Sequence, residues 1–497
     1  MGLYALLAIL ALLTLISLLS SKISSQINMP CLLLFLAVGL LTGTEGLQMI
    51  TFRNAELANV IGSVALAFIL FSGGFDTNWK GIKPVFITGG LMSSIGVLLT
   101  ALFCGAFTKL SAMIFLPDTD IPFSWCMLLG AIISSTDAAA VFSILRSRSV
   151  SLKGNIAPLL ELESGSNDPM AAFTTIFMVS VIANEQTTGN TLPLSGYWVI
   201  IPMFLLKMSI GLAVGFIIGK AASWLYNKID FDYYGLYYVL VIVVVLSAFS
   251  IPELLYGNGF MGVYVAGITM GNSRFVYRNG VGKFCDGIAW LMQIVLFTML
   301  GLLALPTRLW EVKWFGLSVA LFLMLAARPL ATFITTLGSK FSTKERALVS
   351  WVGLRGGAPI MLATFPLMAQ INNSDLMFHV VFFIVITSVL FQGMTIMPMA
   401  KLLKLNAPLH KTPKSPLSID ETGDKNTISR EFTVPENINE LSIAEINVPK
   451  EVLILMIRRR ENIIVPRGDT RLFTGDILTV LGSYDKVTDF GKKLTEL

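Results

Sequence analysis

Two short polar stretches interrupt segments of the sequence that are otherwise apolar. The first is Ser-Ser-Thr-Asp at 134–137, and the second is Glu-Ser-Gly-Ser-Asn-Asp-Pro at 163–169. Residues four apart share one face of a helix, so Ser164 lies with Asp168 and Glu163 lies with Asn167. Oxygen atoms of hydroxyl and carboxylate groups are the ligands that hard cations prefer. We therefore expect a small-cation site here, with Asp168 at its centre and with Thr136 and Asp137 nearby.

Two arginines stand in apolar segments further along the chain. Arg328 lies too far inside its segment to remain unpaired, and Glu163 is the partner that we expect for it. Arg355 lies within Gly-Leu-Arg-Gly-Gly-Ala-Pro at 353–359, a composition that predicts a break in a helix. The charge of Arg355 would either repel cations from an empty site or anchor the C-terminal end of a half-helix.

The composition indicates an integral membrane protein. Apolar residues make up 54% of the 497 positions and charged residues only 13%, whereas soluble domains carry about 25% charged residues. A charge at the middle of a bilayer costs about 2.5–3.5 kcal/mol, so the buried charges above should lie inside a helix bundle and have a function there. The four cysteines have unrelated spacings, which argues against a disulfide framework and a zinc site. With only two histidines in the chain, protons that cross the membrane would have to be carried by carboxylates.

Hydropathy predicts thirteen spanning helices, each of roughly 20 mostly apolar residues. The expected spans are 2–20, 30–48, 57–75, 85–108, 123–145, 155–183, 196–225, 232–252, 258–272, 284–305, 312–337, 346–371 and 377–403. The first has no basic residue before it and is long enough to span the membrane, so we expect a retained helix rather than a signal peptide. Lys207, in the seventh span, has no expected partner and would extend its amine toward the membrane surface.

The distribution of basic residues agrees with this number of spans. Loops after odd-numbered spans contain sixteen lysines and arginines, and loops after even-numbered spans contain four. Cytoplasmic loops of membrane proteins carry the excess of basic residues. We therefore expect the N-terminus outside and the C-terminal tail in the cytoplasm.

Thirteen spans also permit an inverted repeat. Six helices, a connecting helix and six more place the second six upside down relative to the first, as in many secondary transporters. Helix 5 then corresponds to helix 12, and these two helices carry the polar interruptions at 134–137 and 353–359. We expect an all-α polytopic membrane protein with two interrupted helices at an ion site.

Residues 1–405 resemble the monovalent cation:proton antiporter family, which includes NhaP-type bacterial exchangers and animal sodium/proton exchangers. The resemblance rests on a combination of motifs: Pro30 with Gly39 and Gly43, Leu-Phe-Ser-Gly-Gly at 70–74, Thr136-Asp137, Glu163-Ser164 with Asn167-Asp168, Arg328, and Gly-Leu-Arg-Gly at 353–356. One position departs from the family. Many members have an acidic residue where this chain has Ser72, so the ion preference cannot be transferred.

The resemblance implies an architecture and a mechanism. Family members are homodimers in which helices 4–6 and 11–13 form a mobile core and helices 1–3 and 8–10 form the dimer panel. Asp168 would bind the cation and the proton alternately, and Asn167 marks the electroneutral branch. The remaining expected residues are Thr136, Asp137 and Ser164 as cation ligands, and Glu163 paired with Arg328.

The composition changes after Leu405. Residues 406–430 are polar and predict a linker, and residues 431–497 alternate in short runs that predict a small α/β cytoplasmic domain. Residues 452–494 resemble the C-terminal half of RCK regulatory domains, the TrkA-C type, which bind small ligands and often pair. No GxGxxG motif follows a strand, so the nucleotide-binding half of an RCK domain is absent.

These features favour an electroneutral potassium/proton antiporter in a bacterial plasma membrane, regulated by a small ligand at the tail. Potassium rests on the RCK resemblance, and sodium stays open as the transported ion. An RCK-gated potassium channel is a second alternative, but the sequence has no TVGYG-like filter. No metal cluster, nucleophile–base pair or phosphate loop suggests an enzyme, and no cofactor is expected.

Overall fold

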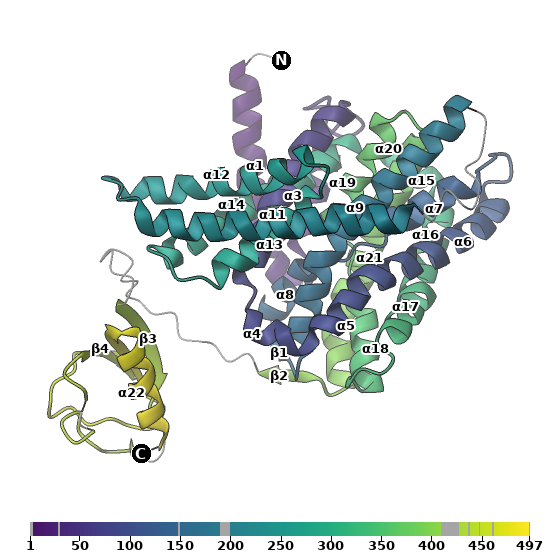
Figure 1. The fold of residues 1–497 in the computed structure, drawn as a ribbon. Helices are drawn as coiled ribbons and strands as arrows, with labels where there is room; N and C mark the ends of the chain where they lie inside the picture. The colour runs from purple at the N-terminus through teal and green to yellow at the C-terminus, as the bar shows by residue number, and fades with distance from the viewer. Residues whose placement is uncertain are drawn as a thin grey trace. The chain divides into compact units, whose positions relative to one another are not determined.

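We describe the chain from a computed structural model, which describes residues 3–27, 30–147, 150–188, 199–408, 427–435, 438–446, 448–459 and 462–496. It has two compact units. The first comprises Met1–Ala222, Val239–Ser273 and Phe284–Leu409, and the second comprises Ser223–Tyr238, Arg274–Lys283 and His410–Leu497. Figure 1 shows that helices make up almost all of the chain before the tail.

The first half of the chain is helical apart from one short strand. Its elements are α1 (Leu3–Ile27), α2 (Cys31–Thr42), α3 (Ala55–Asp76), α4 (Trp79–Ile82), the 3₁₀ turn η1 (Lys83–Val85), α5 (Phe86–Leu91), the π-helical segment η2 (Met92–Gly96), α6 (Val97–Phe115), α7 (Phe123–Ile132), α8 (Ala138–Ser147), strand β1 (Val150–Leu152), α9 (Ile156–Thr188) and α11 (Ile200–Lys228). Asn54 begins α3 by accepting a hydrogen bond from the backbone N–H of Leu57.

The rest of the helical region follows the same pattern. Its elements are α12 (Tyr234–Leu254), α13 (Gly259–Gly271), α14 (Arg278–Leu303), α15 (Pro306–Glu311), α16 (Lys313–Phe322), the π-helical segment η3 (Leu323–Ala327), α17 (Arg328–Thr335), α18 (Thr343–Trp351), α19 (Gly357–Leu362), α20 (Thr364–Met368) and α21 (Ser374–Leu402). A capping box begins α18, because Ser342 and Glu345 exchange side-chain and backbone hydrogen bonds.

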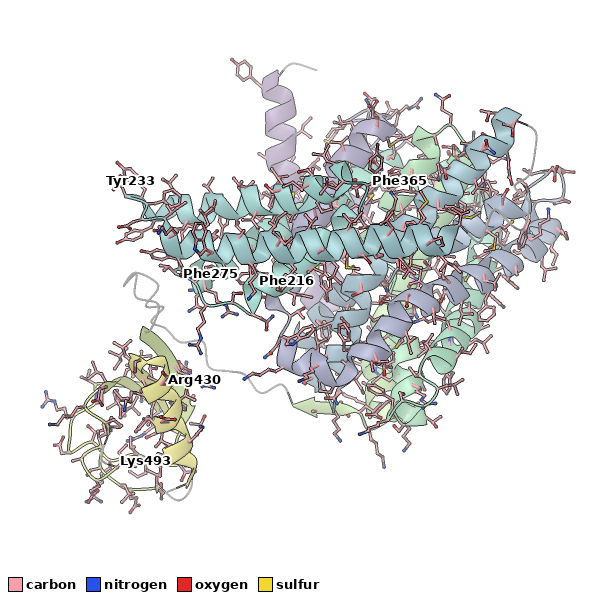
Figure 2. The ribbon with its side chains drawn as sticks, in the orientation of Figure 1. Phe216, Tyr233, Phe275, Phe365, Arg430 and Lys493 are labelled. Carbon is pink, nitrogen blue, oxygen red and sulfur yellow. The ribbon has the colours of Figure 1, made fainter. Side chains whose placement is uncertain are left out.

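Among the described residues, seven helical segments are long and apolar enough to cross a membrane. They are Ala55–Asp76, Trp79–Phe115, Ile201–Lys228, Tyr234–Leu254, Arg278–Leu303, Lys313–Thr335 and Ser374–Leu402. Large apolar side chains on them remain exposed, as Phe216 of α11 illustrates at 50% exposure (Figure 2). Exposed apolar surface of this extent suits contact with lipid. The thirteen spans and the inverted repeat stay predictions.

Both segments that the sequence predicts to be interrupted are broken in the structure. The helix that begins with α7 stops at Ile132 and resumes as α8 at Ala138. The helix that begins with α18 stops at Trp351 and resumes as α19 at Gly357. By contrast, α9 continues through Pro169 without a break.

A two-stranded sheet connects the loop after α8 to the start of the tail. Strand β1 pairs antiparallel with β2 (Asn406–Pro408), with Ser151 opposite Ala407. The backbone N–H of Lys153 adds a hydrogen bond to the carbonyl of Leu405, at 2.9 Å. Of the predicted linker 406–430, residues 409–426 lie outside the described part of the chain.

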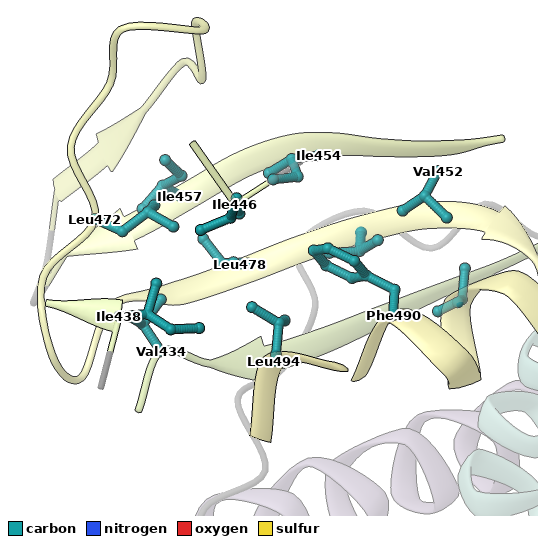
Figure 3. Close-up of a cluster of buried hydrophobic side chains, with 12 residues drawn as sticks. Val434, Ile438, Ile446, Val452, Ile454, Ile457, Leu472, Leu478, Phe490 and Leu494 are labelled. Atoms are coloured by element: carbon teal, nitrogen blue, oxygen red, sulfur yellow. The ribbon is translucent and has the colours of Figure 1, made fainter. Parts of the chain in front are cut away.

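The tail forms a small domain with a sheet and a helix. Its strands β3 (Thr427–Thr433), β4 (Val452–Arg459), β5 (Asn462–Ile464) and β6 (Ile477–Ser483) form an antiparallel sheet in the order β3-β6-β4-β5, and α22 (Tyr484–Glu496) follows. Phe490 and Leu494 of α22 pack into a buried cluster with Val452, Ile454 and Leu478 (Figure 3).

Two ion pairs accompany this core. Arg459 binds Asp476, with 2.8 Å between Nη2 and Oδ2, and Arg458 lies 3.4 Å from Glu431. Burial raises the pKa of Glu431, although the positive charge of Arg458 acts in the opposite direction. The amphipathic helix and the alternating strands together supply a core for this 70-residue region.

Candidate functional site

The two interrupted segments cross at their breaks. The backbone N–H of Asp137, in the break between α7 and α8, donates a hydrogen bond to the carbonyl of Leu354 at 2.8 Å. Leu354 lies in the break between α18 and α19. An added Cβ on the neighbouring Gly356 would overlap the Asp137 carboxylate, so only glycine permits this approach. Each break therefore satisfies part of the exposed backbone of the other.

Asp137 caps the half-helix α8. Its Oδ1 accepts a hydrogen bond from the backbone N–H of Ala140 at 3.0 Å, in the first turn of that helix. A negative charge at this position is stabilised by the positive end of the helix dipole. The Asp137 side chain also lines a cavity, so its carboxylate serves the fold of the break and faces the site at the same time.

Asp168 lies opposite this break on the continuous helix α9. It is 8% exposed and lines the same cavity. Its Oδ1 accepts a short hydrogen bond from the hydroxyl of Ser135. A buried carboxylate with one hydroxyl partner and one side open to a cavity can accept either a proton or a cation.

Hydrogen bonds join α9 to the break before α8. The Ser164 hydroxyl donates to the backbone carbonyl of Thr136 and accepts from the backbone N–H of Ala138, each at 2.9 Å. The Asn167 amide donates to the Thr136 hydroxyl. Ser164, Thr136 and Asn167 thus lie together with Asp168, as the sequence predicts, and they anchor the irregular backbone from Ile133 to Asp137.

Glu163 and Arg328 form a buried ion pair. Arg328 Nη1 lies 2.5 Å from Glu163 Oε1, and Nη2 donates to Oε2 at 2.8 Å. Both side chains are at most 4% exposed. The pair joins α9 to α17, directly after the π-helical segment η3. A buried pair of this kind becomes costly when one partner is removed, because the other charge is then left without compensation.

Arg355 lies in the second break and is 1% exposed. Its Nη1 donates to the carbonyl of Gly353 at 3.0 Å, and its backbone N–H donates to the hydroxyl of Ser388 at 3.1 Å. Gln392, one turn after Ser388 on α21, donates to the carbonyl of Trp351, the last residue of α18. Arg355 and α21 thus bind the backbone at and just after the C-terminal end of α18, and both roles expected for Arg355 stay predictions.

The site opens into a cavity of about 340 Å³. Asp137, Ser164 and Asp168 line it. Three further acidic residues also line it: Asp76 at the end of α3, Glu161 on α9 and Asp286 near the start of α14. Asp76 and Asp286 are exposed, whereas Asp168 is buried, so the acidic side chains extend from the surface to the site.

Several residues of this arrangement are not predicted from the sequence. The sequence places Ser135 in a hydroxyl-rich stretch but does not predict that it is the partner of Asp168. Asp76 and Asp286 lie at the ends of predicted spans, where acidic residues carry no special signal. Ser388 and Gln392 are four apart on one face of an apolar helix, which was the available signal for a polar contact.

Comparison with known proteins places the chain in a family. Residues 8–402 match the family model described as "Sodium/hydrogen exchanger, transmembrane". The chain belongs to this exchanger family. Residues 430–495 match the TrkA-C domain, which agrees with the resemblance of the tail and lies close to the predicted boundary at 431.

Individual relatives of this exchanger are similar over most of their length. The K(+)/H(+) antiporter NhaP of Alkalimonas amylolytica is 37% identical over 443 residues, which cover 85% of this chain and 74% of that protein. The K(+)/H(+) antiporter NhaP2 of Shewanella sp. (strain ANA-3) is 36% identical over 471 residues, 93% of this chain and 78% of that protein.

A solved structure shares the fold of the exchanger. The sodium proton antiporter MjNhaP1 from Methanocaldococcus jannaschii, at pH 8, aligns with a TM-score of 0.66 and 25% identity. The alignment covers 80% of this chain and 99% of MjNhaP1.

Proposed function

We propose that this exchanger is an electroneutral potassium/proton antiporter in which Asp168 binds the cation and the proton alternately. The observation that carries the proposal is the position of Asp168: it is buried, faces a cavity lined by acidic side chains, and has Ser135 as its hydrogen-bond partner. Ionised Asp168 would bind the cation, and protonation of Asp168 would remove its charge and release the cation.

The surrounding residues favour a single exchanging carboxylate. Asp137 is occupied with the backbone of α8, and Asn167 offers an amide beside Asp168 where a second acid would otherwise add charge. One cation would then exchange for one proton. Thr136, Ser164 and Asp137 would supply further oxygen atoms, and Glu163 with Arg328 would keep α9 and α17 in register.

The cavity supports alternating access. Its lining residues belong to the start of α2, the second half of α3, α8, the first halves of α9 and α14, and Tyr264 of α13. Under the predicted orientation, the start of α2, the ends of α3 and α8, and the starts of α9 and α14 lie on the cytoplasmic side. The structure then corresponds to a state open to the cytoplasm, and a second state must open the opposite side. A channel would instead need a path open at both ends.

Potassium is the ion that we favour, because two relatives that match 85% and 93% of this chain are named K(+)/H(+) antiporters. Sodium is the second candidate, because MjNhaP1 is named a sodium proton antiporter. The chain has Ser72 at a cavity position where an acidic residue is common in the family. An uncharged side chain at this position is a difference that could alter the preference.

The test is transport by purified protein in liposomes that contain a pH-sensitive dye. We expect an outward-directed proton flux when potassium is added outside, a weaker flux with sodium, and none in either salt for Asp168→Asn. The proton flux should be the same when valinomycin sets the membrane potential and no uncoupler is present, because one-for-one exchange moves no net charge. A normal flux with Asp168→Asn would exclude the mechanism, and potassium flux without proton movement would indicate a channel.

The proposed topology, assembly and membrane orientation rest on the family resemblance and on the sequence. We propose thirteen spans in an inverted repeat, and the two π-helical segments support it, because η2 and η3 fall in helices 4 and 11, which correspond in such a repeat. We also propose a homodimer in a bacterial plasma membrane, with the N-terminus outside. Light scattering of the purified protein and labelling of single cysteines in intact cells would test these assignments.

The TrkA-C domain suggests regulation of transport from the cytoplasm. We propose that it binds a small ligand and changes the transport rate. Truncation after Pro408 should then alter the rate without changing the preferred ion. An identical rate in the truncated and full-length proteins, with cytoplasmic extract present, would contradict this proposal.

A further inference from the structure

We divide the helices into two groups that follow the mobile core and the panel implied by the family resemblance, and several glycines bring backbones together within each group. In the group of α2, α3 and α11–α14, a Cβ added to Gly39 would overlap the carbonyl oxygen of Thr298 on α14. A Cβ on Gly271 of α13 would likewise overlap the backbone of Phe75 on α3. In the group of α4–α9 and α16–α21, Gly130 of α7 lies in the same way against the backbone of α6. Backbone contacts of this kind leave no room for sliding.

Across the boundary between the groups, glycines face side chains instead. A Cβ on Gly62 of α3 would meet Met361 Cγ at 2.8 Å. A Cβ on Gly357 of α19 would meet Leu296 Cδ2 at 2.9 Å, and Gly165 of α9 lies under Tyr264 of α13. Side chains can change rotamer while helices slide past each other, as in shear motions between packed helices. The contacts at the boundary are therefore of a kind that permits the two groups to move.

The boundary is closed at the end of α3 that lies away from the cavity. The cavity residues on α3 extend from Ile69 to Thr77. Asn59 lies about 25 Å from Asp76 along the helix axis, at a rise of 1.5 Å per residue. At this end α3 packs against α19 and α20. Leu296 and Met361 fill the contact and are at most 1% exposed.

A hydrogen bond crosses the boundary at this closed end. Asn59 Nδ2 donates to Thr364 Oγ1 at 2.9 Å. Asn59 is 7% exposed and Thr364 is fully buried. The Thr364 hydroxyl in turn donates to the carbonyl of Met361 at 2.6 Å, which orients its lone pair toward Asn59. A buried amide that loses such a partner is destabilised unless water replaces it.

We propose that Asn59 and Thr364 form the polar latch of a gate that closes the far end of the cavity. The inference rests on the proposed exchange, because a cation bound at Asp168 must leave on that side in the second state. When the two groups slide, water enters between α3 and α20 and satisfies both side chains. Asn59 and Thr364 thus act as positioning residues that set the balance between the two states, and neither contacts the transported ion.

The first test measures access to the gate from outside. Met361→Cys is introduced into a protein whose four native cysteines are replaced by alanine, and intact cells are treated with a membrane-impermeant maleimide. We expect Asn59→Ala and Thr364→Val each to increase the labelling rate about tenfold, and the two together to do no more than either alone. Thr364→Ser keeps the hydroxyl and should retain the original rate. Unchanged labelling in both single variants would overturn the latch.

The second test locks the gate. Asn59→Cys with Thr364→Cys is joined by a short bis-thiosulfonate reagent in proteoliposomes, which should stop exchange until dithiothreitol releases the link. Full exchange in the linked protein would overturn the proposal. Asp168→Asn separates the two hypotheses, because maleimide labelling does not require transport. Faster labelling of the latch variants alongside normal transport by Asp168→Asn would retain the gate and reject the proposed function.

Discussion

Asp137 and Asp168 are carboxylates in one cavity, yet their neighbours give them different tasks. Asp137 accepts a backbone hydrogen bond from α8 and adjoins Gly356 of the second break. Asp168 lies on an unbroken helix, and a side-chain hydroxyl is its partner. A hydroxyl can rotate to donate to a carboxylate or accept from a carboxylic acid, whereas a backbone N–H can only donate. The partner of Asp168 is therefore compatible with both of its protonation states.

This difference leads to a prediction for Ser135. Replacement of Ser135 by alanine should raise the half-saturating potassium concentration about tenfold, because a hydrogen bond to a charged group is worth about 1.5–3 kcal/mol. Transport by proteoliposomes over a range of potassium concentrations measures the change. Ser134→Ala is the matched control, since that hydroxyl donates only to the carbonyl of Ala131. Equal effects of the two substitutions would show that Ser135 has no special role.

At this scale the sequence predicts residue types better than partners. Asp168, Asn167, Ser164 and Thr136 could be grouped because helical spacing and a run of hydroxyls are visible in one dimension. The bond between Ser135 and Asp168 joins two helices, and it depends on how α7 turns at Ile133, which no local pattern specifies. Glu163 could be paired with Arg328 because few carboxylates are available in the apolar segments to compensate a buried arginine.

The two broken helices form the element that holds the site. Their breaks have different compositions, with three hydroxyl residues in one and two glycines in the other. Hydroxyl side chains satisfy the exposed backbone in the first break, while the second depends on support from Ser388 and Gln392 of α21. The run of hydroxyl residues beside Asp137 predicts the first break, and glycine and proline predict the second. Their crossing at Asp137 and Leu354 is a tertiary contact, and so are the supports from α21.

The close contact between the two breaks predicts that Gly356→Ala strongly reduces transport. The added methyl group would overlap the Asp137 carboxylate and force the two breaks apart. We expect at least a tenfold loss of exchange in proteoliposomes, with the protein still monodisperse in size-exclusion chromatography. Gly90→Ala on α5 is the control, because a Cβ there meets no atom within 4 Å. Exchange at the original rate by Gly356→Ala would show that the crossing can open without consequence.

At the scale of the whole molecule, acidic residues from different helices surround one opening. Asp76 comes from α3, Glu161 from α9 and Asp286 from α14. Their sequence positions are far apart, and only the assembled bundle brings them to the same cavity. Like charges along a cleft raise the local concentration of counter-ions, which here are the cations to be exchanged. The membrane class was predictable from composition, but this charged opening was not.

The charged opening predicts a salt-dependent effect of Asp76→Asn combined with Asp286→Asn. The double variant should raise the half-saturating potassium concentration severalfold at low ionic strength, measured with inside-out vesicles. The effect should fade in 1 M choline chloride, where the Debye length shrinks to about 3 Å. Asp118→Asn, an exposed acid in the loop before α7, serves as the control. A shift of the same size at both ionic strengths would exclude this explanation.

The short sheet of β1 and β2 determines where the tail can act mechanically. The linker to the TrkA-C domain starts directly after β2, and β2 is hydrogen-bonded to β1. Strand β1 in turn follows α8, the half-helix that Asp137 caps. A force applied to the chain after β2 therefore acts on the hydrogen bonds between β1 and β2 before it acts on a spanning helix. The strand pair therefore joins the point where the tail leaves the helices to the chain segment that follows α8.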